Sequence, residues 1–203
     1  MSKTEESAKG AIPEGRNEGA VAFLKTRRSR PAKMLHPPAP EGEALRELLT
    51  MAARAPDHGK LEPWRFIVMG PETRAAFADA AEARGRERGL EPARIEKSVS
   101  GFRTSPLIVA VVASPKPSDK VPGIEQILSA ANVAYGLLNA ALASGWGANW
   151  LTGWMAHDEP LLAETLGLKE GETLVGFIHI GTADRTPPDR PRPDIDAITE
   201  WRP

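Results

Sequence analysis

The segment at residues 124–144, IEQILSAANVAYGLLNAALAS, most constrains the fold, because small and apolar residues occupy nearly every side of a helix drawn over it. It ends at Gly145, and glycine is typical of helix C-termini. A helix that is apolar on most sides must be buried on most sides. In a chain of 203 residues, such a helix lies either at the centre of the molecule or in a dimer interface.

Helices and strands of mixed order are predicted around this segment. Two β-branched runs, at 64–69 and 106–113, are typical of strands, and the second is apolar on both faces, as in a central strand. Further strands are predicted at 148–153 and 173–181, and further helices at 17–24, 41–54, 71–90, after Pro92 and at 158–168. This order, with some long connections, indicates an α+β or mixed α/β sandwich. A Rossmann or P-loop fold is disfavoured, because neither glycine-rich motif is present.

Charge and composition exclude several kinds of partner and chemistry. The 26 basic and 27 acidic residues leave a net charge of -1, which provides no general attraction for nucleic acid or anionic membranes. Any anion site must therefore be local. The chain has no cysteine, which excludes disulfides, thiolate zinc sites and a cysteine nucleophile. No apolar run reaches the roughly 20 residues of a membrane span, so we expect a cytoplasmic protein.

Residues 1–16 mix charge, serine and glycine without a period, and a flexible N-terminal arm is predicted there. Residues 17–203 are predicted to form one domain. Its C-terminal extension, about 182–203, is rich in proline and charge, yet Ile195, Ile198 and Trp201 need cover. We expect this extension to lie along a surface, that of a partner subunit if the protein is a dimer.

The first candidate site is KTRRSR at residues 25–30, where Lys25, Arg27, Arg28 and Arg30 surround Ser29 near the end of a predicted helix. Guanidinium groups match phosphate oxygens in bidentate fashion, and a hydroxyl adds a further hydrogen bond. The cluster is therefore a candidate phosphate site. Alternatively, the arginines only complement the dipole at the helix C-terminus.

The second candidate site is ARAPDHGKLEPW at residues 53–64, which crowds Arg54, Asp57, His58 and Lys60 into a loop before a strand. Ionisable residues on a loop between rigid elements commonly form a binding surface. Alternatively, this is a solvated turn in which Asp57 and His58 cap backbone groups.

Together with two later motifs, these clusters resemble the nitroreductase family of FMN-dependent oxidoreductases, especially its short YdjA-like members. The residues that carry the resemblance are Arg27-Arg28-Ser29, Arg54-Ala55-Pro56-Asp57-His58, Pro63-Trp64-Arg65-Phe66, Trp150-Leu151-Thr152-Gly153, and Val175-Gly176-Phe177 followed by Gly181-Thr182. Their order and approximate spacing match the family from about residue 20 to residue 182. The resemblance implies a nitroreductase-like three-layer α/β/α sandwich of the α+β class, with a mixed, mainly antiparallel central sheet and a long central helix.

The resemblance also implies a homodimer with FMN at the subunit interface. Arg27 and Ser29 would hold the FMN phosphate and ribityl chain, and Arg28 would supply backbone or side-chain contacts. Either Arg190 or Arg192 would add a basic group that holds the phosphate. The residues expected to reach the flavin from the other subunit are Arg54, Asp57 and His58, while Lys60 stands where larger members have asparagine. The residues expected against the flavin ring are Trp150, Leu151, Thr152 and Gly153.

The activity implied is reduction of nitroaromatics, quinones or related small acceptors, with NAD(P)H as co-substrate and ping-pong kinetics. No residue of the chain is expected to act as a catalytic acid, base or nucleophile, because the flavin would carry the chemistry. No metal is expected, since no ligand spacing supports one. The alternatives are a flavoprotein of the same fold with other chemistry, namely reductive dehalogenation or flavin breakdown, or a non-catalytic module that binds a nucleotide or phosphate.

Overall fold

The middle layer of the protein is a four-stranded sheet. The computed structural model describes residues 15–202, so most of the predicted N-terminal arm lies outside the described residues. The strands β1 (Trp64–Met69), β2 (Leu107–Ala113), β3 (Gly147–Leu151) and β4 (Thr173–Gly181) are arranged in the order β1-β2-β4-β3. All three pairings among the described residues are antiparallel, which confirms a mainly antiparallel sheet. β2 is buried along its whole length, as predicted for a central strand.

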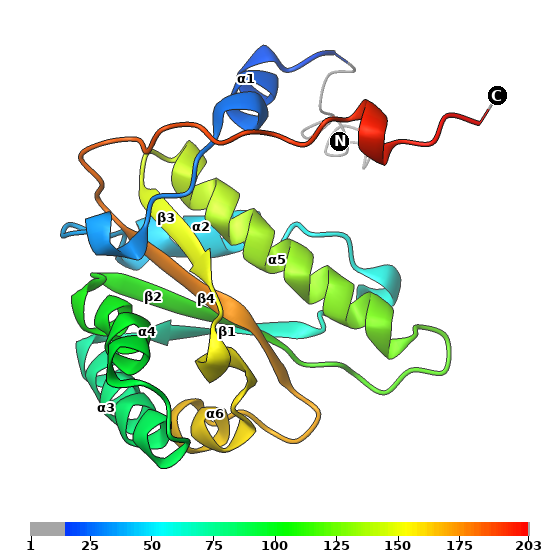
Figure 1. Ribbon diagram of the computed structural model, residues 1–203. Helices are drawn as coiled ribbons and strands as arrows, with labels where there is room; N and C mark the ends of the chain where they lie inside the picture. Colours follow the sequence, from blue (N-terminus) through cyan, green and yellow to red (C-terminus); the bar gives the residue numbers. More distant parts are fainter. Residues whose placement is uncertain (1–14, 203) are drawn as a thin grey trace, which may run out of the picture.

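One face of the sheet is covered by α5 (Gly123–Ala143) and α2 (Gly42–Ala52), as Figure 1 shows. Because side chains alternate along a strand, this face receives Val109 and Val111 from β2 and Ile178 from β4. These residues and the two helices form one continuous apolar cluster. The predicted helix over residues 124–144 is thus confirmed, and its inner side belongs to the core.

The opposite face is covered by α3 (Pro71–Glu87), α4 (Pro92–Thr104) and α6 (Glu159–Leu166). Its core contains three aromatic rings whose centroids lie 4.6 to 5.2 Å apart, from Phe77, Phe102 and Phe177. The three layers of the predicted α/β/α sandwich are therefore present. Short 3-10 helices occur in the connections, as η1 (Ala32–Met34), η2 (His58–Lys60), η3 (Trp154–His157) and η4 (Asp196–Ile198).

The outer side of α5 remains apolar and exposed. Ile124, Leu128 and Tyr135 are 61%, 56% and 43% exposed, at spacings that place them on one side of the helix. By length and composition alone α5 could also cross a membrane, but half of its most apolar stretch of 18 residues is buried inside the protein, and one such helix is weak evidence for a membrane span. A stripe of this kind is typical of a surface that another protein surface covers.

The helix α1 (Glu18–Thr26) lies outside the three layers, and none of its residues is buried. It begins as predicted, with the Asn17 side chain accepting a hydrogen bond from the Ala20 N–H. The C-terminal tail, residues 182–202, runs past α1 and away from the sandwich in Figure 1. Its apolar residues are strongly exposed, namely Ile195, Ile198 and Trp201.

A polar cluster is buried between β4 and α4. His179 is fully buried, its Nδ1 lies 2.8 Å from the Ser105 hydroxyl, and Arg74 donates a hydrogen bond to the Ser105 carbonyl oxygen. Burial, followed by the positive charge of Arg74, lowers the pKa of His179 to about 4. His179 is therefore neutral in the folded protein at pH 7, and protonation must favour unfolding.

The lowered pKa of the buried His179 predicts that the folded protein loses stability as the pH falls from 6.5 to 4. The unfolded chain takes up a proton at His179 near pH 6.5, whereas the folded chain does so only near pH 4, so stability falls as the pH drops through this window. From pH 7 to pH 5, the free energy of unfolding should fall by about 2 kcal/mol through this group. Urea denaturation at both pH values measures it, and His179→Gln should reduce the difference.

His36 provides the control for this experiment. Its contacts with the Pro37 carbonyl and the Asp184 carboxylate raise its pKa, so its contribution has the opposite sign and is lost as the pH rises. His36→Asn should therefore leave the loss of stability between pH 7 and pH 5 in place. Equal losses in the wild type and in His179→Gln would exclude His179 as the cause.

Candidate functional site

The basic cluster at residues 27–30 is an extended segment whose side chains point alternately to two sides. Arg27 donates from Nη2 to the Ser29 hydroxyl at 3.2 Å, and its guanidinium lies 5.9 Å from the centre of the Tyr135 ring on α5. Arg28 donates from Nε to the Pro188 carbonyl at 3.2 Å. Arg30 donates from Nη2 to the Thr186 hydroxyl at 2.8 Å. Arg27 and Ser29 thus form one group, while Arg28 and Arg30 hold the C-terminal tail.

Further contacts tie residues 28–36 to the start of this tail. His36 and Thr182 exchange backbone hydrogen bonds of 3.0 and 2.9 Å, and His36 Nε2 lies 2.8 Å from the Asp184 carboxylate. Arg28 also lies 3.7 Å from Asp189. The tail from residue 182 to residue 189 is therefore attached to the N-terminal segment. The side chain of Arg28, predicted to be a phosphate ligand, is used here for that attachment.

Arg27 has no acidic partner among residues 15–202, and unlike Arg30, which also has none, it is not one of the arginines that hold the C-terminal tail. It is half-buried, and its Nε is shielded from solvent without a hydrogen-bond acceptor. A buried donor left unsatisfied costs about 1–3 kcal/mol. Arg30 beside it has a lowered pKa, because of burial first and the charge of Arg28 second. The corner is electropositive, and an anion placed there would meet an uncompensated guanidinium.

The second part of the candidate site is the outer edge of β3. β3 is an edge strand, and the Arg30 N–H donates to the Ala148 carbonyl at 2.8 Å along this edge. Because successive backbone groups of a strand face opposite edges, the Trp150 N–H faces the same side as Ala148. Beyond it, Leu151 and Thr152 are exposed, and Gly153 has a φ of 69°, which favours glycine.

Trp150 connects two of the sequence motifs. Its indole N–H donates to the Val175 carbonyl at 3.3 Å, and its ring lies directly over Gly176. A Cβ at residue 176 would lie 2.6 Å from Trp150 Cδ1 and closer still to the indole nitrogen. Residue 176 must therefore be glycine, because the ring of Trp150 occupies the space that a Cβ would need.

The loop at residues 53–64 is ordered by its own side chains. The Asp57 carboxylate accepts hydrogen bonds from the N–H groups of Leu61 at 3.2 Å and Glu62 at 2.8 Å. His58 Nδ1 lies 2.8 Å from the Glu125 carboxylate at the start of α5. Within one chain, Asp57 thus caps backbone groups, as the alternative interpretation of this loop proposed. Arg54 and Lys60 form no ion pair among the described residues.

This loop also contains unusual backbone geometry. Lys60 and Glu62 have φ values of 56° and 47°, and they are the only non-glycine residues with positive φ in the described chain. Such conformations cost of order 1–3 kcal/mol each and cluster at functional sites. A cavity of about 610 Å³ lies beside the loop, and Asp57, Lys60 and Glu62 are among the residues that line it.

The two clusters do not meet within one chain. Arg27 contacts α5 at Tyr135, whereas His58 contacts it at Glu125, ten residues earlier. At 1.5 Å per residue, these points are about 15 Å apart along the helix. The expected C-terminal arginines lie closer to the first cluster, because Arg192 pairs with Asp189 at 2.6 Å and Arg28 lies beside the same carboxylate. Arg190 is exposed, and its N–H donates to the Asp189 side chain.

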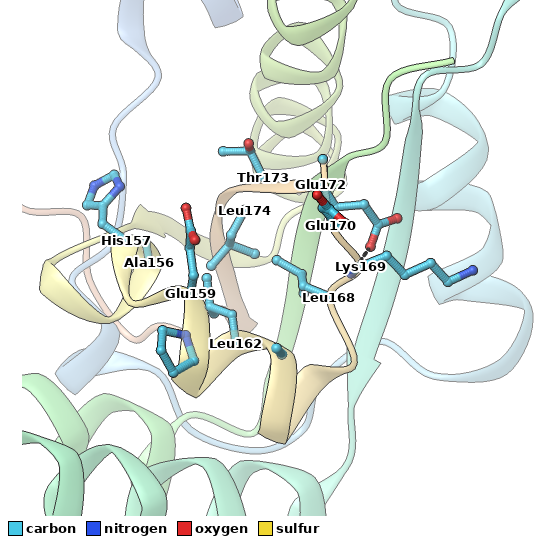
Figure 2. Close-up of a pocket in the computed structure, with 13 residues that line it drawn as sticks. Ala156, His157, Glu159, Leu162, Leu168, Lys169, Glu170, Glu172, Thr173 and Leu174 are labelled. Atoms are coloured by element: carbon cyan, nitrogen blue, oxygen red, sulfur yellow. Dashed lines mark hydrogen bonds between the residues drawn. The ribbon is translucent and has the colours of Figure 1, made fainter. Parts of the chain in front are cut away.

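A larger cavity, of about 690 Å³, lies between α6 and the turn into β4 and contains none of the predicted site residues. Figure 2 shows Leu162 and Leu174 between Glu159 on one side and Glu170 on the other. Glu172, also in its wall, is bound by Arg65 through two hydrogen bonds of 2.7 and 2.8 Å. This arginine holds the pKa of Glu172 at about 2. Among residues 15–202, no group of three histidine or acidic side chains could hold a metal ion.

Comparison with known proteins places these features in a family. The sequence model described as "Nitroreductase family" matches residues 24–182. The chain belongs to the nitroreductase family. It is 36% identical over 163 residues to "Putative NAD(P)H nitroreductase YdjA" of Escherichia coli K12, which covers 80% of this chain and 87% of that protein. It is 38% identical over 165 residues to a "Putative NAD(P)H nitroreductase" of Haemophilus influenzae, covering 80% and 88%.

Solved structures of nitroreductase-like proteins share the fold. The protein from Bacillus cereus superimposes with a TM-score of 0.76 at 26% identity, covering 94% of this chain and 99% of that one. A protein from Desulfovibrio desulfuricans, described as a nitroreductase in complex with FMN, gives a TM-score of 0.70 at 20% identity, covering 93% and 100%. The second likeness supports the fold alone.

Sequence reasoning missed two features of this nitroreductase family member. One is Tyr135, the only tyrosine in the chain, which was included in an apolar helix without a separate role. Its single aromatic ring among small residues was the available signal. The other is the use of Arg28 and Arg30 for the tail, which no local pattern indicates, because their partners lie about 160 residues away along the chain.

The contact between Trp150 and Gly176 predicts a strong effect of Gly176→Ala. The added methyl group must displace the indole from its position over β4, and overpacking of this kind costs about 1–3 kcal/mol. Urea denaturation should show this loss, and near-UV circular dichroism should show a changed tryptophan signal. Gly123→Ala is the matched control, because Gly123 is the exposed first residue of α5, has no positive φ and has open space around it. Equal stability of the two variants would contradict the packing argument.

Proposed function

We propose that this nitroreductase family member is a cytoplasmic FMN-dependent NAD(P)H oxidoreductase that reduces nitroaromatics, quinones or related small acceptors. The observation that carries the proposal is Arg27, which has no acidic partner among residues 15–202, is hydrogen-bonded to Ser29, and belongs to the segment that lies along the outer edge of β3. A phosphate dianion would meet a guanidinium and a hydroxyl there, the groups that bind phosphate best. The names of the relatives and the FMN complex of the Desulfovibrio protein support the same proposal.

The residues present fit FMN in two respects. The buried Nε of Arg27 lacks an acceptor, which a phosphate oxygen could supply. The Trp150 N–H at the edge of β3 could donate to a flat ring placed along that edge, with Leu151, Thr152 and Gly153 beside it. Bound FMN would supply the hydride-transfer chemistry, and the chain would bind it, orient it and shield one face.

Two copies of the chain would complete the site. The apolar outer side of α5 and the exposed apolar tail residues are surfaces that a second copy could cover. The loop at residues 53–64 lies about 15 Å along α5 from Arg27 in its own chain. Arg54, Asp57, His58 and Lys60 would therefore reach FMN bound to the partner rather than to their own chain. We propose a homodimer on this basis, with Arg190 or Arg192 adding positive charge near Arg28.

NAD(P)H and the electron acceptor would use the same open face of the flavin in turn. Such sharing predicts ping-pong kinetics, in which oxidised nicotinamide leaves before the acceptor binds. No side chain of this chain needs to act as an acid or base in the proposal. Steady oxidation of NAD(P)H with nitroaromatics or quinones would separate it from reductive dehalogenation and from flavin breakdown.

Removal of the anion-binding pair should abolish tight binding of FMN. The purified protein should be yellow, and Arg27→Ala with Ser29→Ala should yield colourless protein. Loss of a charge-assisted hydrogen bond costs about 1.5–3 kcal/mol, so Arg27→Ala alone should raise the Kd for FMN about 10- to 150-fold. Quenching of flavin fluorescence measures this Kd.

Lys97→Ala is the matched control, since Lys97 is an exposed cation on α4, which covers the opposite face of the sheet. It should change the Kd by less than about 2-fold, the effect of a screened surface charge. A wild-type protein that cannot be reconstituted with FMN would exclude the proposed enzyme. It would favour a phosphate-binding module instead.

A charge on the outer side of α5 should disrupt the proposed dimer. Leu128→Glu would place a carboxylate on an apolar surface, where an unpaired charge is strongly unfavourable once buried. Sedimentation should show a shift from dimer to monomer, with loss of flavin. Ala163→Glu, on the exposed side of α6, is the control and should remain dimeric. A monomeric wild type that binds FMN would reject the shared site.

A further inference from the structure

The guanidinium of Arg27 is held by neighbours rather than by its own helix. Arg27 follows α1, which buries none of its residues, so α1 cannot position the side chain accurately. Its position depends on the Ser29 hydroxyl at 3.2 Å, the Tyr135 ring at 5.9 Å, and the Arg30 N–H bonded to Ala148. Of these, only Tyr135 belongs to a helix of the core.

Tyr135 is suited to act as a fixed support. Its backbone lies in α5, where Ala134 and Leu137 on either side are fully buried against the sheet. The side chain itself is 43% exposed and lies under the Arg27 guanidinium. An aromatic face attracts a cation within about 6 Å of its centre. The apolar residues before it on the same side of the helix, Leu128 and Ala131, have no such face.

We propose that Tyr135 is a positioning residue for the anion site: its ring fixes the Arg27 guanidinium beside Ser29, ready to bind the phosphate of FMN. This inference rests on the proposed function for the identity of the ligand. The ring acts through Arg27 and need not touch the ligand. Since cation–π contacts at partly exposed sites are weak to moderate, removing the ring should weaken FMN binding about 2- to 30-fold.

A double-mutant cycle on the full-length protein tests the proposal. The Kd for FMN would be measured by flavin fluorescence for wild type, Tyr135→Leu, Tyr135→Phe, Arg27→Ala and Arg27→Ala with Tyr135→Leu. Tyr135→Leu should raise the Kd about 2- to 30-fold, and Tyr135→Phe should restore it to within about 2-fold of wild type. In the Arg27→Ala background, Tyr135→Leu should have no further effect, because the two residues act as one unit.

Each departure from this pattern overturns the inference. Equal weakening by Tyr135→Phe and Tyr135→Leu would show that the hydroxyl contacts the ligand directly. Additive effects in the cycle would show that Tyr135 acts independently of Arg27. Sedimentation of Tyr135→Leu should show the oligomeric state of wild type, and dissociation of this variant would assign the weaker binding to the interface instead.

A second measurement does not depend on FMN. In the ligand-free protein, the ring current of Tyr135 should change the nuclear magnetic resonance chemical shift of the Arg27 Nε–H, because the guanidinium lies over the ring. The change should disappear in Tyr135→Leu and persist in Tyr135→Phe. If wild type fails to bind FMN but shows this pattern, the proposed function fails and the positioning of Arg27 stands; an unchanged signal in Tyr135→Leu rejects the positioning.

Discussion

The packing of α5 against one face of the sheet is the constraint on which both parts of the candidate site depend. Nine residues of this helix are buried, and six of them belong to the same apolar cluster as Val109, Val111 and Ile178 of the sheet. Because α5 cannot shift without opening this core, the groups on its outer side are fixed in space. Tyr135 then holds Arg27 towards one end, and Glu125 and Ser129 hold the 53–64 loop towards the other. The distance between the two clusters is set by the helix.

The fold was largely predictable because its signals are local and repeated. Seven consecutive apolar residues predict β2 as a buried strand, and the composition of α5 predicts a core helix. The contact between Arg27 and Ser29 was predictable from residue type and spacing, and their role as an anion site stays a prediction. The different contacts of the arginines within RRSR were not predictable, because they depend on Thr186 and Pro188, which only the fold brings to that place. Asp57 likewise fits either a cap or a ligand until the loop conformation is known.

Several arginines of the fold are compensated by carboxylates. Arg84 and Arg88 both pair with Asp158, at 3.2 and 2.9 Å, and Arg65 pairs with Glu172. Arg74 and Arg27 lack carboxylate partners among residues 15–202, and each has a buried Nε without an acceptor. Arg74 is enclosed between α3 and Ser105, where no ligand can replace the missing partner. Arg27 is half-buried beside an open strand edge, so a bound anion can compensate it.

The strained backbone of the 53–64 loop is held by hydrogen bonds from within the same chain. Lys60 and Glu62 occupy left-handed conformations that are unfavourable for residues with side chains. Two hydrogen bonds to the Asp57 carboxylate offset part of that cost, and Ser129 holds the start of the loop at the Pro56 carbonyl. In the proposed homodimer, the strained loop would present Lys60 and His58 in fixed positions to FMN held by the second copy.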